Sequence, residues 1–317
     1  MAQRSMRIVL HDEAKLAKVN PENLQLVEKY KIDMALRELA PTTQRQYIYN
    51  LQQWLVYVYD NQNNKSVLKI EDDDLTQFLY FCKSKGNNSA RMKARIATLS
   101  AFYKFLRKKH YLTTNPVEFI EPPKKATPVI IQTFLTNEQV ALMREKLIEH
   151  GDTQLRLYAM LSLSTMARAN AIASIKWSQI DIKESCIHDV LEKEGKIVDL
   201  YFNDEVKYLL LNLKGERELK KQEDYGWLFR SGRCTPEKHI NVGTLNDWCK
   251  KIGSMIGVNT MHTHDWRHSG ATMLANAGMP LEDVSILLNH ESTDTTRRFY
   301  IKHDTARISS KKNMINL

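Results

Sequence analysis

The sequence predicts a mainly α-helical protein with a small antiparallel β-sheet, divided into two domains. Apolar residues recur at helical spacing along most of the chain, a pattern typical of amphipathic helices. Two β-rich runs flank a charged turn that contains Gly195, and this arrangement predicts a hairpin. Four of the eight prolines lie between residues 116 and 128, where they predict a stiff, extended linker.

The segment before the linker predicts a helical domain at residues 25–115, preceded by an extension at residues 1–24. Pro41 begins one run of apolar residues at helical spacing. Asp72-Asp73-Asp74 precedes another, and acidic side chains suit the positive amino end of a helix. Asn115-Pro116 closes the unit, because proline cannot continue a helix.

The linker spans residues 116–133, and a second domain is predicted at residues 134–303. Thr136-Asn137-Glu138-Gln139 is a capping-box sequence, which marks the start of a helix. Residues 155–163 are almost uninterruptedly apolar and predict a buried helix. Further helices are expected after Asn203 and around residues 245–256. A tail at 304–317 follows.

The charge of the protein indicates a polyanionic partner. The 317 residues carry a formal net charge of +9, and residues 1–125 hold 21 Lys and Arg against 13 Asp and Glu. Residues 75–117 contain no acidic residue, although a surface helix normally mixes both signs. We expect basic side chains there to bind DNA phosphates and to position the protein more than to read sequence. The candidates are Lys83, Lys85, Arg91, Lys93, Arg95, Lys104 and Lys108.

Other classes of function are disfavoured. No stretch approaches 18 apolar residues and no signal peptide is apparent, so we expect a cytoplasmic protein without a membrane partner. The four widely spaced cysteines predict reduced, structural thiols. The sequence contains no phosphate-binding glycine loop, so nothing in it indicates ATP binding. His262, His264 and His268 lack convincing further ligands, so neither a metal site nor a cofactor is expected.

The carboxyl-terminal region contains the residues most suggestive of chemistry. Residues 264–277 predict a helix with Thr263 as its N-cap and Gly278 just beyond its end. His264 and Arg267 lie three residues apart and share a face. A second helix is expected to end at Asn289-His290, and a third, short helix carries Tyr300.

These side chains suit attack on a phosphodiester. A guanidinium binds phosphate oxygens bidentately, and imidazoles can donate hydrogen bonds to the same group. A phenol has a pKa of about 10 and needs such a positive environment to act as a nucleophile. Taken singly, each His could be an ordinary surface or core residue, and Tyr300 could fill an apolar groove.

The order of these residues resembles the tyrosine recombinase (phage integrase) family. The matching sequence segments are H-D-W-R-H-S-G-A-T-M-L-A-N-A-G, L-L-N-H and T-D-T-T-R-R-F-Y. Two departures are present: Asn289 replaces the usual glycine, and ten residues rather than nine separate His290 from Tyr300. Asn is the second-best residue for a left-handed helix end.

The resemblance also implies an upstream arginine and a lysine. Arg168 ends the segment S-T-M-A-R, which is similar to the start of the family's motif T-G-L-R-x-x-E-L. In this comparison Met166 stands at the position of the family's glycine. The family's catalytic lysine lies on a β-hairpin, where Lys193 matches best and Lys196 is the rival.

The first domain contributes L-S-A-F-Y-K-F-L and Asn115-Pro116, which look like the family's helical core-binding domain. The resemblance thus covers residues 25–303. It implies a site-specific recombinase or integrase in which Tyr300 forms a 3′-phosphotyrosyl bond with duplex DNA. Arg168, Arg267, His264 and His290 would assist at the phosphate, and Lys193 would protonate the leaving oxygen.

The resemblance further implies a homotetramer on two DNA sites, with tails that dock on neighbouring protomers, although a frayed tail fits this sequence nearly as well. We expect association with the nucleoid. The DNA target and any accessory bending or directionality proteins stay open. Two alternatives also stay open: a type IB topoisomerase with the same chemistry, and a non-catalytic DNA-binding regulator.

Overall fold

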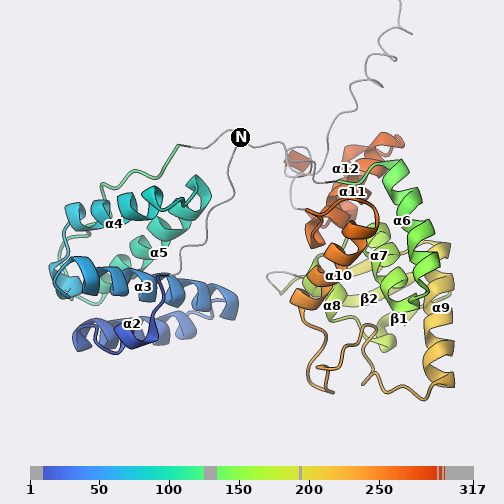
Figure 1. The fold of residues 1–317 in the computed structure, drawn as a ribbon, viewed down its shortest axis with the longest axis horizontal. Coiled ribbons are helices and arrows are strands. Elements are labelled where there is room, and N and C mark those ends of the chain that lie inside the picture. Colours follow the sequence, from blue (N-terminus) through green and yellow to red (C-terminus); the bar gives the residue numbers. More distant parts are fainter. Residues whose placement is uncertain (1–9, 125–133, 193–194, 291–292, 295, 297–317) are drawn as a thin grey trace, which may run out of the picture. The chain divides into compact units, whose positions relative to one another are not determined.

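The computed structural model of the chain (Figure 1) describes residues 10–124, 134–192, 195–290, 293–294 and 296. The chain divides into two compact units, residues 1–130 and 131–317. Each unit has its own buried core, and each is described by itself. No helix in these described ranges combines the length and apolarity that crossing a membrane requires.

The first unit is a bundle of helices. Proline at the first helical position begins both α2 and α3, because its missing N–H is not needed there. Glu71 and Asp74 form a capping box at α4, and Asn88 caps α5. The helices are α1 (Glu13–Leu16), α2 (Pro21–Leu36), α3 (Pro41–Asn61), the 3-10 turn η1 (Val67–Lys69), α4 (Asp72–Ser84) and α5 (Ser89–Lys108).

Aromatic side chains fill the core of this bundle. Trp54 on α3 meets Phe102 and Tyr103 on α5 edge-on, and Tyr30 on α2 packs against Phe102. Tyr103 also donates its hydroxyl to the carbonyl of Val67 at 2.9 Å, which ties α5 to η1. The aromatic residues interleaved with the basic residues of α5 are therefore core residues.

The second unit surrounds α7, which is buried along most of its length and packs against α6, α9, α11 and β3. Its helices are α6 (Asn137–His150), α7 (Thr153–Thr165), α8 (Ala169–Ala173), η2 (Trp177–Gln179), α9 (Asp204–Leu219), α10 (Val242–Met255), α11 (Thr263–Asn276) and α12 (Leu281–Leu287). The predicted capping box at Thr136 and Gln139 and the predicted start of a helix after Asn203 are confirmed.

The sheet is the predicted antiparallel hairpin with one short strand added. Its order is β1 (Ile180–Asp181), β2 (Cys186–Leu191) and β3 (Ile197–Tyr201). Ile187 pairs with Leu200 and Val190 with Val198, so β2 has an extra residue between these two pairs. This bulge includes Asp189, whose φ of 53° is left-handed.

Both helices that carry the candidate site end as the sequence predicts. Gly278 after α11 and Asn289 after α12 have φ of 104° and 51°. In each case the next residue bonds back to the helix, with the amide of His290 donating to Ser285 at 3.1 Å. The predicted N-cap Thr263 is wrong by one residue. His262 is the N-cap, because its amide donates to the carboxylate of Asp265 in a capping box.

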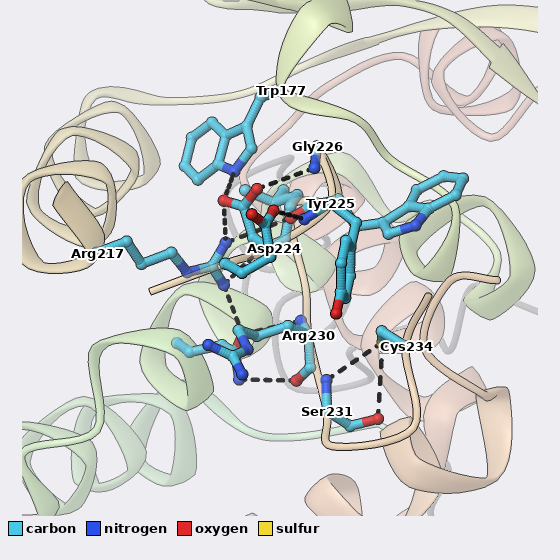
Figure 2. A network of polar contacts seen from close by, with 12 residues as sticks. Trp177, Arg217, Asp224, Tyr225, Gly226, Arg230, Ser231 and Cys234 are labelled. Carbon is cyan, nitrogen blue, oxygen red and sulfur yellow. Dashed lines mark hydrogen bonds and ion pairs between the residues drawn. The ribbon is translucent and has the colours of Figure 1, made fainter. Parts of the chain in front are cut away.

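A polar network around Arg217 fastens the loop after α9 to the rest of the second unit (Figure 2). The buried guanidinium of Arg217 donates to Asp224 at 3.1 Å, to Gln154 at 2.7 Å and to the carbonyl of Leu228 at 2.9 Å. Trp177 donates its indole N–H to the same carboxylate at 2.8 Å. Burial lowers the pKa of Arg217, and Asp224 opposes that effect. These contacts support the fold and lie outside the predicted site.

Candidate active site

Among the predicted site residues that the structure describes, Arg267 on α11 is the most deeply buried, with 1% of its surface exposed. Its Nη1 donates to the carbonyl of Met166 at 2.8 Å. Its Nη2 donates to the carbonyl of Leu288 and lies 2.9 Å from Nε2 of His290. The guanidinium therefore joins the end of α7 to the end of α12 and fixes its own orientation.

The end of α7 turns sharply so that Met166 can present this carbonyl. Met166 has φ 54° and ψ 20°, a left-handed conformation that disfavours residues other than glycine. This explains why the family's word has glycine at this position. The side chain of Met166 is buried against Ala271, Val284 and Leu288, which offsets the backbone cost.

Arg168 follows this turn and pairs with an acid that the sequence did not predict. Its Nη1 forms an ion pair with Oε2 of Glu192, which directly follows β2 in the hairpin turn. The carboxylate is 1% exposed, whereas the Arg168 side chain is 29% exposed. Among the described residues, Oε1 of Glu192 has no hydrogen-bond partner. Burying a carboxylate oxygen without a hydrogen bond costs free energy, so the hydrogen bonding of the Glu192 carboxylate is incomplete.

His290 lies between Arg267 and Thr296. Because a guanidinium can only donate, Nε2 of His290 accepts from Arg267, and the ring proton sits on Nδ1, which donates to Thr296 Oγ1 at 2.8 Å. Burial lowers the pKa of His290 to about 4, with smaller effects from the charges of Arg267, Arg168 and Lys196. His290 is thus neutral near pH 7.

His264 lies in the first turn of α11, one residue after Thr263, and part of its side chain faces solvent. Loss of solvation lowers its pKa, and the nearby His262, Arg267 and Arg168 lower it further. Arg168 and Arg267 therefore act electrostatically on both His264 and His290. These shared effects place the four predicted residues within electrostatic range of one another, and Arg267 and His290 are in direct contact.

The two lysine candidates lie on the turn between β2 and β3. Lys193 is outside the described residues. Lys196 is exposed, and its carbonyl accepts the amide of Glu192 at 2.7 Å to close the hairpin. Its charge contributes to the lowered pKa of His290, which places Lys196 within electrostatic range of the site.

Tyr300, the predicted nucleophile, also lies outside the described residues. Tyr158 on α7 is buried against α11, and its hydroxyl lies 3.2 Å from Nε1 of Trp266 and 3.0 Å from the sulfur of Cys249. Burial raises the pKa of Tyr158 strongly, so it serves the core and is unsuited to attack.

The predicted phosphate contacts of the first unit divide into two groups. Lys83, Lys85, Lys93, Lys104 and Lys108 are exposed, and Arg91 is half-buried with a bond to Asn50 at 2.8 Å. Arg95 requires a correction, because it is 2% exposed. It donates to Asn87 at 2.8 Å and to Gln53 at 2.9 Å, so it joins α5 to α3 and does not face solvent beside Arg91.

Comparison with known proteins bears on this arrangement. Residues 132–307 match the phage integrase family, and residues 27–110 match the phage integrase N-terminal SAM-like domain. The chain belongs to the phage integrase family. The predicted family, the fold class and the type of enzyme, a tyrosine-type site-specific DNA recombinase, are confirmed.

Two relatives of this recombinase are named tyrosine recombinase XerC. The protein from Pediococcus pentosaceus is 25% identical over 281 residues, covering 86% of this chain and 92% of the relative. The protein from Herpetosiphon aurantiacus is 27% identical over 289 residues, covering 85% and 88%.

Solved structures share the fold of the recombinase. XerH bound to its palindromic difH substrate, a post-cleavage complex, has a TM-score of 0.71 at 20% identity and covers 95% of this chain and 88% of that one. A lambda integrase (75–356) dimer bound to a COC′ core site has a TM-score of 0.66 at 17% identity and covers 87% and 94%.

Proposed function

We propose that this recombinase cleaves and rejoins duplex DNA through a 3′-phosphotyrosyl bond to Tyr300, with a free 5′-hydroxyl on the other side of the break. The proposal is supported by the electrostatic effect of Arg168 and Arg267 on both His264 and His290, and by the contact between Arg267 and His290. Four residues that span more than 120 positions of sequence gather where a phosphate could be held. A regulator that only bound DNA would not need this convergence.

Arg267 and Arg168 bind the non-bridging oxygens of the scissile phosphate and stabilise the charge that grows in the transition state. Arg267 is already oriented by Met166 and Leu288. The phosphate takes the place of Glu192 at Arg168, because a guanidinium fork matches phosphate as well as carboxylate.

His264 receives the proton of the tyrosine hydroxyl. Its lowered pKa keeps it neutral near pH 7, and a neutral imidazole can act as a general base. His290 orients Arg267 through Nε2, and it can donate to phosphate only when Nε2 carries a proton. Lys193 protonates the leaving 5′-oxygen, with Lys196 as the alternative.

The covalent intermediate conserves the energy of the phosphodiester, so no cofactor is required. A 5′-hydroxyl from a second duplex reverses the attack and completes strand exchange. We place the DNA-binding domain at residues 25–115, the linker at 116–133 and the catalytic domain at 134–303. Four protomers on two DNA sites would carry out the exchange, with residues 304–317 docking between protomers. A lambda integrase tetramer bound to a Holliday junction shares the fold and supports this assembly.

The proposal can be tested without knowing the DNA target. The protein and its Tyr300→Phe variant are expressed in cells, complexes that survive boiling in detergent are collected, and the attached DNA is sequenced. A discrete sequence attached only to the protein with Tyr300 is the expected result. Attachment at scattered sequences would indicate a topoisomerase. Equal, detergent-labile binding by both proteins would contradict covalent catalysis.

A further inference from the structure

Three potential metal ligands meet on the β2–β3 hairpin, away from the contacts of Arg267. They are the sulfur of Cys186, Nδ1 of His188 and a carboxylate oxygen of Asp199, and all three atoms lie within 4.8 Å of one another. Nδ1 of His188 is 3.7 Å from the sulfur and 3.3 Å from Oδ2 of Asp199.

The bulge in β2 produces this arrangement. Cys186 and His188 are two residues apart on β2, and the extra residue between the pairs Ile187–Leu200 and Val190–Val198 places both His188 and Asp189 opposite Asp199. Nδ1 of His188 therefore points towards the carboxylate of the neighbouring strand as well as the thiol of its own strand.

These separations suit a tetrahedral ion. Zinc lies about 2.3 Å from sulfur and about 2.0–2.2 Å from nitrogen or oxygen ligands. Two such ligands on a tetrahedron are about 3.3–3.6 Å apart, so small side-chain movements would bring these three atoms into place. The side chains of His188 and Asp199 are 45% and 42% exposed, which leaves a path for the ion and a position for water.

A backbone contact helps to hold one of the candidate ligands in position. The second oxygen of Asp199 accepts the amide of Asp189 at 3.2 Å. Metal ligands commonly have such supporting hydrogen bonds, which fix their orientation. Asp181 adds a further negative charge close to Cys186 and His188.

We propose that Cys186, His188 and Asp199 bind one divalent ion of the zinc type, with water completing its coordination. A thiol, an imidazole and one carboxylate select zinc over magnesium or calcium, which prefer all-oxygen sites. From the sequence we expected no metal site, and this proposal departs from that expectation. The sequence shows only a Cys-x-His pair, and the third ligand joins it through the hairpin.

Binding exchanges a proton for the ion. Burial and the charges of Asp199 and Asp181 raise the pKa of the Cys186 thiol, so it is protonated near pH 7 and is a poor nucleophile. The ion displaces that proton, and the thiolate, the neutral imidazole and the carboxylate become ligands. One proton is released from the thiol for each ion bound. The ion would join β2 to β3 within the hairpin whose turn carries Lys193 and Lys196.

The site is tested by titrating the purified, chelator-treated full chain with Co²⁺. Cobalt bound to a thiolate gives a near-ultraviolet charge-transfer band, which does not depend on recombination activity. We expect this band to appear with one equivalent of Co²⁺ and to disappear when Zn²⁺ is added. Zinc should also raise the temperature of unfolding, because an ion that binds only the folded state stabilises it.

The variants localise the site. Cys186→Ala should abolish the band, and Asp199→Asn should weaken binding at least tenfold, as should His188→Gln. Asp189→Asn is the matched control, since it removes an adjacent carboxylate from the same bulge and should bind Co²⁺ normally. Cys234→Ser controls for the other thiols.

Three results would overturn the proposal. The first is no band in the unaltered protein, and the second is a band that survives Cys186→Ala. The third is equal weakening by Asp189→Asn and Asp199→Asn, which would indicate diffuse attraction to an acidic surface. A cooperative unfolding transition in each metal-free variant shows that any lost binding is not lost folding.

Discussion

Arg267 donates from Nη1 to the carbonyl of Met166 at 2.8 Å, a contact between residues 101 positions apart. The contact exists because Met166 adopts a left-handed conformation at the end of α7, which turns its carbonyl towards α11. Arg267 is thereby oriented before any phosphate arrives. Such preorganisation is the main means by which fixed donors accelerate reactions that develop charge.

Gly270 permits this close approach of α11 to α7. A Cβ at Gly270 would lie 2.6 Å from the carbonyl oxygen of Leu163 and 2.5 Å from Cγ of Met166. We expect Gly270→Ala to destabilise the protein by about 1–3 kcal/mol through overpacking. Gly215→Ala on α9 is the control, because a Cβ there meets open space and alanine favours a helix by up to about 1 kcal/mol. The unfolding temperature of Gly270→Ala should fall below that of the unaltered protein, and that of Gly215→Ala should rise above it. Similar unfolding temperatures for the two variants would show that the close approach at Gly270 is unimportant.

Replacing Arg267 by lysine should remove the orientation while keeping the charge. A lysine cannot reproduce the fork that reaches Met166, Leu288 and His290. We expect single-turnover cleavage of the trapped DNA site by Arg267→Lys to fall on the order of 100–1000-fold. Equilibrium binding to the same duplex, measured alongside, should change far less. Cleavage close to the wild-type rate would mean that charge alone suffices.

Glu192 should oppose phosphate binding at Arg168. Glu192→Gln removes the buried carboxylate that pairs with this guanidinium, so the affinity for the cleavage-site duplex should rise. Glu184→Gln, at an exposed position before β2, changes the net charge equally and serves as the control. Binding is compared at several salt concentrations by fluorescence anisotropy. If the two variants bind identically, the ion pair does not compete with DNA.

His290 should make the stability of the protein depend on pH. Its pKa is about 4 in the folded protein, below the ordinary value of about 6.5. Between pH 4 and pH 6.5 the folded state therefore binds fewer protons than the unfolded state. The contribution of His290 to the free energy of unfolding is complete above pH 6.5 and is lost as the pH falls towards 4. His290→Gln cannot titrate there. The difference in unfolding free energy between the two proteins should shrink from pH 7 to pH 4, and a constant difference would refute the lowered pKa.

The basic residues of α5 should separate by experiment into surface and core groups. Lys104→Ala and Lys108→Ala should each weaken DNA binding and reduce the slope of log affinity against log salt by about 1. Arg95→Met should leave that slope unchanged, because Arg95 is buried against Asn87 and Gln53. Its effect should appear in unfolding instead. A reduced salt slope for Arg95→Met would contradict the buried position.

The sequence predicted the elements whose signals are local. The capping box at Thr136, the left-handed residues Gly278 and Asn289, and the hairpin around Gly195 all depend on neighbouring residues, and all are present. The N-cap of α11 was misplaced by one residue because a histidine N-cap is less common than threonine, and Asp265 completes the box from inside the helix.

Features that depend on distant contacts could not be predicted in the same way. The run without acidic residues placed Arg95 among the expected DNA contacts, but burial of Arg95 depends on Gln53 from another helix. Glu192 gave no signal, because its pairing with Arg168 requires the chain to return through the sheet. The same hairpin brings Asp199 to Cys186 and His188.

The central claim is that Tyr300 becomes joined to DNA, and the attachment site can be identified directly. Covalent complexes are trapped on a nicked duplex of the recovered site, digested with nuclease and trypsin, and sequenced by mass spectrometry. Cleavage after Arg298 and Lys302 releases Phe299-Tyr300-Ile301-Lys302. The account predicts a nucleotide 3′-phosphate on the tyrosine of this peptide. A nucleotide on any other residue, or an undiminished covalent complex with Tyr300→Phe, would contradict it.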